Sequence, residues 1–267
     1  MRGAHETREL SGAERTLLYD AEQTLVRQCM RERGFRVWPV PRQPIADDRR
    51  FPYAVDDAGW AAKHGYGSDI QRRVEKLRAT DPNRLYYAGL PPERRKAATA
   101  ALNGTSPEGL SARLPGGGEV TASTEGCTAW AQSALYTDLP AWFEADVVTG
   151  QLPAMAQNQV RADPAYRKSV GAWAACMRER GYAYKNPDDS RAQFLSTEKK
   201  SGDTSREREI RSAVDEAACA DDSGLSATAH RFERKYEAAL RAKYRTAVES
   251  RLRLEHAALP RARETTR

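Results

Sequence analysis

One short loop, His64-Gly65-Tyr66-Gly67, has residue types that could do chemistry. The imidazole of His64 could act as an acid or a base near neutral pH. The glycines would let backbone amides approach a ligand closely, and Tyr66 could stack on it. The same residues could instead cap neighbouring helices, and this structural interpretation is the simpler one.

Three pairs of adjacent aspartates are further candidates for acid and base chemistry: Asp56-Asp57, Asp188-Asp189 and Asp221-Asp222. Neighbouring residues on a helix do not face each other, so a catalytic pair would have to be built across the fold. Asp188-Asp189 follows Asn186-Pro187, where acids suit the first turn of a helix. A structural role is therefore favoured.

Aromatic residues crowd into residues 38–87, among several prolines. Such a surface could line a groove for a peptide or a glycan, because aromatic side chains give a large contact area at a low entropic cost. It could also fix an irregular segment to the helices around it, which is the simpler role. The ligand-binding candidates are Trp38, Tyr53, Trp60, His64 and Tyr66.

No cofactor or metal site is expected. The glycine run at 116–118 lacks the Lys and Ser/Thr of a phosphate-binding loop, and the cysteines and histidines form no cluster with zinc-site spacing. No run of 18 apolar residues predicts a membrane span. Residues 1–8 hold no apolar stretch of the signal-peptide type, so no leader is expected in this chain.

The excess positive charge lies at the C-terminal end. Residues 231–267 contain 11 Lys/Arg and 5 Asp/Glu, whereas the rest of the chain contains 32 of each, so this segment carries the whole net charge of +6. Such an excess indicates an anionic partner, for instance an envelope polymer, with nucleic acid not favoured. A solvated helix with a basic end is the simpler alternative.

An internal repeat marks the ends of two of the predicted helices that must position these residues. The heptapeptide CMRERGF at 29–35 recurs as CMRERGY at 176–182. Each copy closes a helical pattern, and Gly34 and Gly181 stand where a helix ends in the left-handed conformation. Phe35 and Tyr182 then fall where the Schellman motif places its hydrophobic contact.

Other signals predict further helices. Ser11 and Glu14 form a capping box, as do Thr204 and Glu207, whose helix has a predicted apolar stripe of Ile210, Val214 and Ala217/Ala218. Helices are also expected over 67–79, after Asp81, Pro92, Pro140, Asp163 and Asn186, and from Leu225 through Tyr244 to Leu252. Residues 105–121 are a predicted loop with a short extended piece at 119–121, and 195–203 a polar loop.

Four cysteines could pair in three ways, or stay reduced as small buried hydrophobes. Both halves share the same order: a helix with a cysteine, a glycine that ends this helix, and a later helix with the second cysteine. Because of this symmetry, we predict the pairs Cys29–Cys127 and Cys176–Cys219. Persistent disulfides imply an oxidising compartment outside the cytosol. Reduced cysteines would instead indicate a cytoplasmic protein.

The stretch Trp173 to Tyr182, with Ala218-Cys219 and Gly224-Leu225 downstream, resembles a broad group of actinobacterial extracytoplasmic proteins of uncharacterised function. Four further stretches are similar to that group: Phe51-Pro-Tyr53, His64-Gly-Tyr-Gly67, Ala101-Leu-Asn-Gly104 and Glu125-Gly-Cys127. The resemblance implies a helical protein, secreted or envelope-bound as a lipoprotein, and often encoded near transport or cell-wall genes. It implies no catalytic residues.

We therefore predict an all-α, pseudo-duplicated fold with halves at 1–150 and 151–267, one disulfide in each half, and a long C-terminal helix. The predicted function is non-enzymatic, extracytoplasmic binding of a peptide, a protein or a cell-envelope component. The alternatives are an enzyme acting on a peptide or wall polymer, with His64 and nearby acids, and a cytosolic adaptor for an anionic partner.

Overall fold

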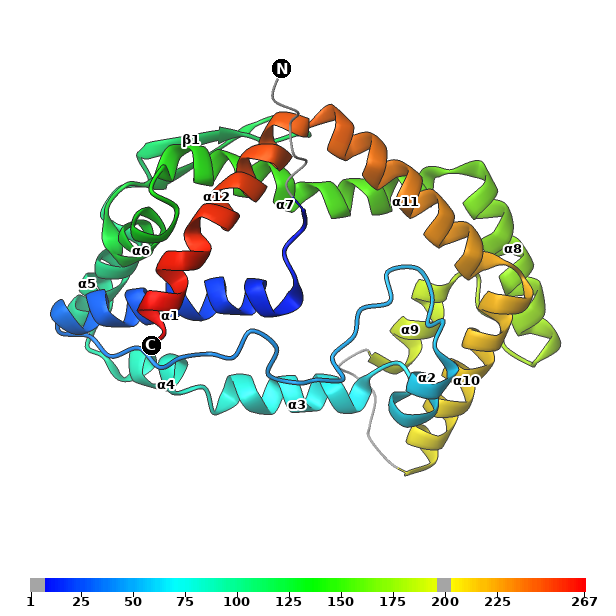
Figure 1. Cartoon of the computed structure of the whole chain (residues 1–267). Helices are drawn as coiled ribbons and strands as arrows, with labels where there is room; N and C mark the ends of the chain where they lie inside the picture. The colour runs from blue at the N-terminus through cyan, green and yellow to red at the C-terminus, as the bar shows by residue number, and fades with distance from the viewer. Residues whose placement is uncertain (1–7, 196–202) are drawn as a thin grey trace, which may run out of the picture. The chain divides into compact units, whose positions relative to one another are not determined.

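The computed structural model describes residues 8–195 and 203–267. In this part the chain is mostly helical, with twelve helices and two strands (Figure 1), which confirms the predicted all-α class. The predicted pseudo-duplication stays a prediction. The predicted capping box at Thr204 and most of the predicted polar loop at 195–203 lie outside the residues whose side chains are described. The repeat-based division at residue 150 stays a prediction.

The chain forms two compact units, each assembled from separate stretches. Unit 1 holds the described residues up to Pro44, Arg78–Leu152 and Arg241–Arg267. Unit 2 holds Ile45–Leu77 and the described part of Pro153–Leu240. The chain passes from one unit to the other within α3 (Ser68–Ala79), α7 (Leu139–Ala162) and α11 (Leu225–Lys243).

Unit 1 is built on α1, which packs against α6 and α12 (Figure 1). Ser11 caps α1 through the backbone N–H of Glu14, and the Glu14 side chain accepts from the Ser11 N–H, so this predicted capping box is confirmed. Leu18 and Ala21 are buried in the core. The elements that lie wholly in unit 1 are α1 (Gly12–Glu32), α4 (Pro82–Gly89), α5 (Pro92–Asn103), β1 (Gly109–Arg113), β2 (Glu119–Ser123), α6 (Gly126–Tyr136) and α12 (Arg245–Thr265).

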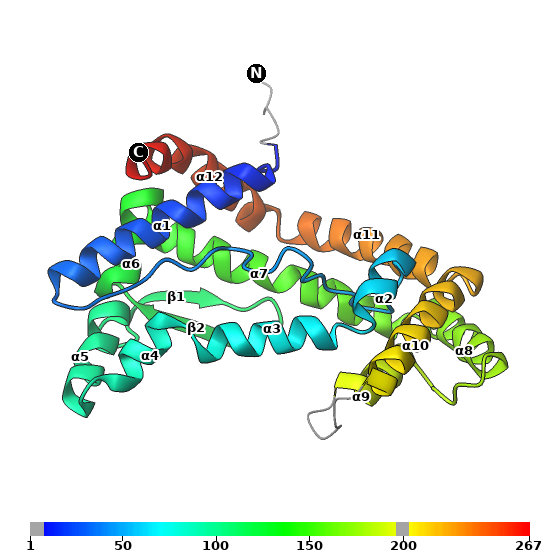
Figure 2. The same cartoon turned by 90° about the horizontal axis from the view of Figure 1, so that it is seen from below.

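The segment predicted as a loop at 105–121 forms a β-hairpin instead (Figure 2). β1 and β2 pair antiparallel, with Leu110 opposite Ala122. The expected extended piece at 119–121 is the start of β2, but β1 was missed. Leu110 and Ala112 alternate with exposed neighbours, and this pattern is too short to distinguish from a loop by periodicity alone.

Unit 2 is built on α10, which packs against α2 and α8 (Figure 1). One core cluster surrounds Trp173 and Met177 of α8, and another contains Trp60 and Tyr66. The elements that lie wholly in unit 2 are α2 (Ala58–His64), α8 (Pro164–Glu179), α9 (Pro187–Leu195) and α10 (Asp203–Asp222).

The two copies of the repeat end their helices in the same way. The Phe35 N–H donates to the Met30 carbonyl, and the Tyr182 N–H donates to the Met177 carbonyl, each at 2.9 Å. Gly34 and Gly181 have φ values of 79° and 89°. Both helix ends are therefore Schellman motifs, as predicted. The repeated heptapeptide thus has the same local backbone structure in its two copies.

The helical stripe expected to run from Leu225 to Leu252 is interrupted at Tyr244, between α11 and α12. Tyr244 has φ −105° and ψ 30°, and its hydroxyl donates to the Pro115 carbonyl at 3.2 Å. Leu225 and Ala229 are buried in a unit 2 core, whereas Leu252 lies in a unit 1 core, so each helix has its own apolar target.

Candidate functional site

Helix α10 carries a buried polar face in unit 2. Glu209, Ser212 and Glu216 are spaced at i, i+3 and i+7 and are 3%, 0% and 0% exposed. Charged groups are this deeply buried only where hydrogen bonds replace their lost water. The surroundings of the two carboxylates therefore decide what this face can do.

Glu209 holds the loop that follows α2. Its Oε1 accepts from the backbone N–H of Tyr66 at 3.0 Å and from that of Ser68 at 3.1 Å. Arg206 pairs with the other carboxylate oxygen at 3.1 Å and also donates to the His64 carbonyl at 2.8 Å. The backbone amides of the loop that was predicted to approach a ligand therefore bind a glutamate of the same chain.

Gly65 explains why this loop needs glycine. Its φ is 60°, and a Cβ at this position would lie 2.8 Å from side-chain atoms of Glu209. Residues with a Cβ are strained in that conformation and would also clash with the carboxylate. The close approach that the glycines permit is to Glu209.

Glu216 ties three segments of unit 2 to α10. It accepts from the Val55 N–H at 2.9 Å, from the Tyr66 hydroxyl at 2.9 Å, and from the Ser190 hydroxyl. Burial raises the pKa of Glu216 to about 7, against the opposing effect of these donors. Burial and the Glu216 charge together raise the pKa of Tyr66.

His64 is buried beside two aspartates. Its Nδ1 lies 2.8 Å from an oxygen of Asp69, and its Nε2 lies 3.8 Å from Asp47. Its ring packs against that of Trp60, with centroids 5.1 Å apart. Because the side chain is only 11% exposed, these contacts fix its ring and leave little of it open to a substrate.

The structure brings three of the five ligand-binding candidates together. Trp60, His64 and Tyr66 lie around α2, and Tyr53 packs on Tyr166 in the adjoining core cluster. All four side chains are buried. Trp38 belongs to unit 1, where its ring packs edge-on against Tyr86. The packing role accounts for their positions, and ligand contact stays a prediction.

The paired aspartates have separate partners. Asp57 caps α2 through the Trp60 N–H at 2.8 Å, and Asp56 contacts His230 at 2.7 Å. Asp188 pairs with Arg161 at 2.8 Å. These carboxylates support local structure and do not converge on a reacting position.

Both predicted disulfides are present, and no cysteine is free. Cys29 joins α1 to Cys127 of α6, with Cα atoms 5.6 Å apart, and Cys176 joins α8 to Cys219 of α10, with Cα atoms 5.7 Å apart. Disulfides of this kind are typical of proteins that fold in an oxidising compartment.

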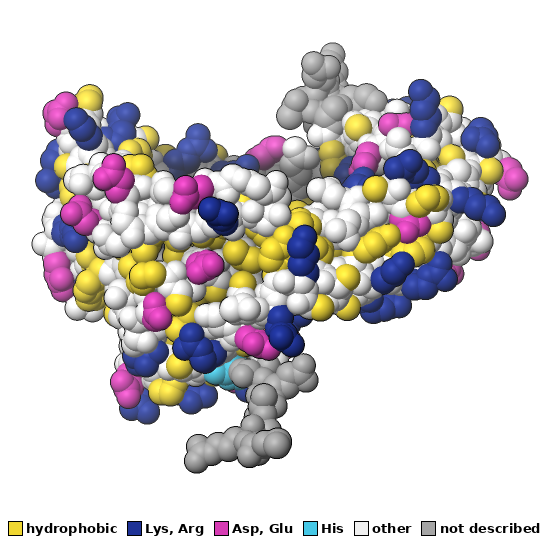
Figure 3. All heavy atoms as spheres, turned by 90° about the horizontal axis from the view of Figure 1, so that it is seen from above, with side chains coloured by type: hydrophobic (Ala, Val, Ile, Leu, Met, Phe, Trp, Pro, Cys, Tyr) yellow, Lys and Arg dark blue, Asp and Glu magenta, His cyan; other side chains and the backbone are white. Residues whose placement is uncertain are grey.

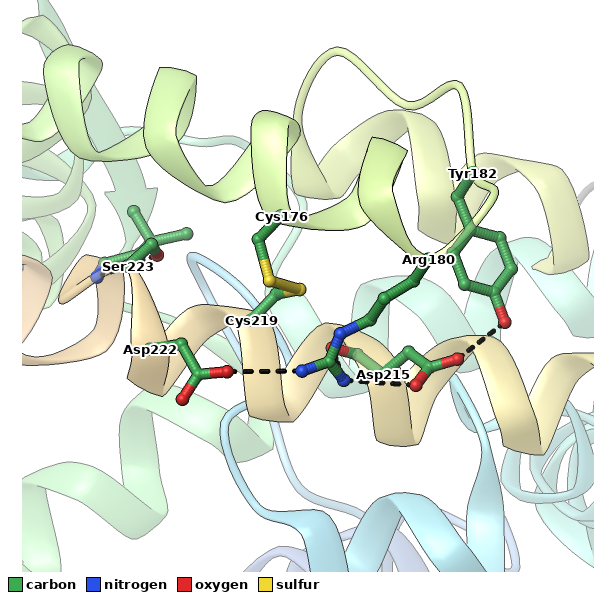
Figure 4. The surroundings of a disulfide bond; sticks show 8 residues. Cys176, Arg180, Tyr182, Asp215, Cys219, Asp222 and Ser223 are labelled. Atoms are coloured by element: carbon green, nitrogen blue, oxygen red, sulfur yellow. Dashed lines mark hydrogen bonds and ion pairs between the residues drawn. A yellow bond between two sulfur atoms is a disulfide. The ribbon is translucent and has the colours of Figure 1, made fainter.

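The second disulfide lies beside a polar clamp between α8 and α10 (Figure 4). Arg180 donates to Asp215 at 3.1 Å and to Asp222 at 3.2 Å, and the Tyr182 hydroxyl donates to Asp215 at 2.8 Å. Burial and this hydrogen bond raise the pKa of Tyr182 to about 12. The clamp and the disulfide together fix the helix that carries Glu209 and Glu216.

Sequence reasoning missed both glutamates because the predicted stripe covers only one edge of the buried face of α10. Of that stripe, Ala217 is buried and Val214 packs against a core cluster, whereas Ile210, Val214 and Ala218 are only partly buried. Counting back from the disulfide-bonded Cys219 in helical steps of three, four and three leads to Glu216, Ser212 and Glu209. The cysteine was therefore the signal for the buried face.

An exposed basic face lies on the part of α11 that belongs to unit 2. Arg231, Arg234 and Lys235 are exposed, and Arg231 and Lys235 lie over the ring of Phe232 at 4.9 and 5.5 Å. Figure 3 shows many exposed Lys and Arg side chains on the face of the molecule in view, interspersed with Asp and Glu. Phe232 in turn stacks on Tyr236, with centroids 6.1 Å apart.

Among the residues that the structure describes, no helix combines the length and the apolar composition needed to cross a membrane. The same residues contain no group of three or more His, Cys, Asp or Glu side chains placed to hold a metal ion.

Comparison with known proteins adds no relative: no protein-family model, no curated protein and no solved structure matches the chain.

Proposed function

We propose that this protein is a non-enzymatic binding or accessory protein that works outside the cytosol and recognises a phosphate-bearing component of the cell envelope. The observation that carries the proposal is the basic face of α11, formed by Arg231, Arg234 and Lys235 beside Phe232. The two disulfides support the compartment.

The chemistry of this face suits a flexible polyanion. Arg and Lys side chains on one exposed helix attract phosphates through charge and need no deep pocket. The stacked rings of Phe232 and Tyr236 hold the charged ends of Arg231 and Lys235 in place by cation–π contact. They also give the ligand an apolar surface to rest on. The hydroxyl of Tyr236 also donates to Asp163, the N-cap of α8, at 2.7 Å, which fixes α11 to the start of α8.

The test measures binding of poly(glycerol phosphate) to the full chain at several salt concentrations, with neutral dextran as the uncharged comparison. We expect binding to the phosphate polymer that weakens steeply as salt rises. Each exposed cation near an anionic surface contributes about 1 kcal/mol, so the triple variant Arg231→Gln/Arg234→Gln/Lys235→Gln should bind on the order of 100-fold more weakly.

A matched variant removes the same charge elsewhere in unit 2. Arg73, Arg178 and Lys185 are exposed on α3, at the end of α8 and before α9, respectively. Replacing all three with Gln should leave polymer binding close to that of the original protein. If both triple variants lost polymer binding equally, binding would depend on net charge alone and the proposal would be overturned. Binding of dextran as tight as that of the phosphate polymer would overturn it too. Binding confined to vesicles that contain phosphatidylglycerol would assign the face to lipid headgroups instead.

A further inference from the structure

Unit 1 contains a cavity of about 520 Å³ that the proposed function does not use. Its walls come from the end of α5, the β-hairpin, the start of α6 and one turn of α7. This volume falls within the range of small-molecule sites. The stretches at 101–104 and 125–127, which lie more than 20 positions apart in the sequence, meet at its edge.

The geometry of that edge is fixed by a close backbone crossing. Gly126 has a φ of 90°, and a Cβ at this position would lie 2.5 Å from the backbone nitrogen of Gly104. The next residue, Cys127, is fully buried and is disulfide-bonded to Cys29 of α1. The backbone crossing and the disulfide hold this wall in place before any ligand arrives. A ligand would therefore not lose binding free energy to ordering the wall.

One wall of the cavity is aromatic. Trp142 is buried and stacks on Tyr136, with centroids 3.5 Å apart and planes 7° from parallel. Phe143 beside it is partly buried against the same core. Together with Leu110, these side chains give an apolar surface on which a flat or aliphatic group could rest.

The charged part of the lining is acidic. Glu125 and Asp146 both line the cavity and are exposed at its mouth, and none of the described lining residues is basic. Gln132, also in the lining, donates to Glu22 at 3.1 Å. Burial, and then the charge of Asp146, raise the pKa of Glu22, so the negative field of Asp146 reaches this side of the cavity.

One nearby cation, Arg251, offsets only part of this negative charge. Arg251 lies 3.3 Å from Asp146, but it is shared with Glu255 at 3.0 Å and with the hydroxyl of Thr149 at 2.7 Å. Its guanidinium also lies over the Trp142 ring at 5.7 Å. Glu125, for its part, accepts only a hydroxyl from Thr105, at 3.1 Å, among the contacts of the described residues.

We propose that this cavity is a binding site for a small organic cation: an ammonium group attached to an apolar body, such as an amine or a basic side chain of a peptide. The apolar body rests on Trp142 and Phe143, and the ammonium group lies between Glu125 and Asp146. The site is independent of the basic face of α11, so either proposal can fail without the other.

Three probes of nearly the same shape separate charge from shape: benzylammonium, benzyl alcohol and benzoate. Their binding to the isotope-labelled full chain is followed by NMR, with the indole N–H of Trp142 as reporter. We expect benzylammonium to bind about 10-fold more tightly than benzyl alcohol, since each exposed ion pair contributes little and two of them together correspond to about one factor of ten. Benzoate should not bind.

Charge-removing variants locate the effect. Glu125→Gln/Asp146→Asn should weaken benzylammonium binding about 10-fold and leave benzyl alcohol binding unchanged. A matched double variant, Glu144→Gln/Glu249→Gln, removes two exposed acids of unit 1 that do not line the cavity, and it should change neither affinity.

Several results would overturn the proposal. Equal affinity for benzylammonium and benzyl alcohol would make the cavity a site for neutral ligands, and preference for benzoate would reverse its charge selectivity. Absence of a Trp142 response to all three probes would show that no such site exists there. If both double variants lost affinity for benzylammonium equally, the affinity would depend on net charge alone.

Discussion

Glu216 on α10 accepts a hydrogen bond from the phenol of Tyr66 at 2.9 Å, although the two residues are 150 positions apart in the sequence. The same carboxylate holds Val55 and Ser190, so one side chain connects four segments of unit 2. Glu216 is fully buried, and its pKa of about 7 means that its charge changes in the neutral range. This contact therefore links the stability of the unit to pH.

The first prediction follows from the direction in which burial shifts the pKa of Glu216, which is upward. A glutamate in the unfolded chain has a pKa of about 4.3, so between about pH 4.3 and pH 7 the folded protein holds the proton more tightly than the unfolded one. Stability contributed by Glu216 should be complete below this window and fall as the pH rises through about 7. The loss should approach about 4 kcal/mol, because each pKa unit corresponds to about 1.4 kcal/mol.

Glu216→Gln tests the assignment, because an amide keeps the acceptor for Val55 without the charge. The hydroxyls of Tyr66 and Ser190 can turn to accept from the new NH₂ group. In urea unfolding measured from pH 5 to pH 9, the variant should lack the decline shown by the original protein and be the more stable of the two at high pH. Parallel pH profiles for the two proteins would assign the decline to other groups.

The sequence predicted structure well where the signal was local. The helix ends at Gly34 and Gly181, the cap at Ser11 and both cysteine pairs depend on neighbouring residues or on the repeat, and all are confirmed. Each of these signals is short-range or symmetric, so it needs no knowledge of packing.

The candidate site was less accessible to prediction. The loop around His64 was correctly singled out, but its main partner, Glu209, lies more than 140 residues away, and an acidic side chain is expected on a solvated face. The cavity of unit 1 was missed entirely, since its lining is brought together partly by a hairpin that periodicity did not reveal. Tertiary contacts of this kind leave no short-range pattern.

Two glycines, one within α8 and one just after it, give the second prediction. Gly171 lies inside α8 and Gly181 just beyond its end, and a Cβ at either position would meet no atom within 4 Å. They differ in backbone conformation, since only Gly181 is left-handed, with φ 89°. Gly171→Ala should therefore raise the free energy of unfolding by about 0.8 kcal/mol, and Gly181→Ala should lower it by about 1 kcal/mol.

Urea unfolding of both variants checks this pair, because neither substitution changes side-chain packing. Opposite signs would show that the repeat's glycine is required by the Schellman turn. If Gly181→Ala were neutral or stabilising, the end of α8 would not be left-handed in solution, and the similarity to the end of α1 would have to be abandoned.

The last prediction concerns the disulfides, which close stretches of different length. Cys29 and Cys127 are 98 residues apart and Cys176 and Cys219 are 43 apart. A cross-link restricts the unfolded chain more when it closes a longer loop, which corresponds to up to about 5 kcal/mol for the first and about 4 kcal/mol for the second. Replacing each pair with alanine should lower the free energy of unfolding in that order.

Alanine also leaves a small void, because Cys127 and Cys219 are fully buried. Unfolding of the original protein in reductant separates the two effects, since the thiols keep their volume while the cross-links are gone. Stability in reductant should fall nearly as far as in a variant lacking both pairs, and hydrogen exchange in α1, α6, α8 and α10 should accelerate. Stability that reductant leaves unchanged would mean that these bonds do not hold the fold, and the oxidising compartment would then lose its support.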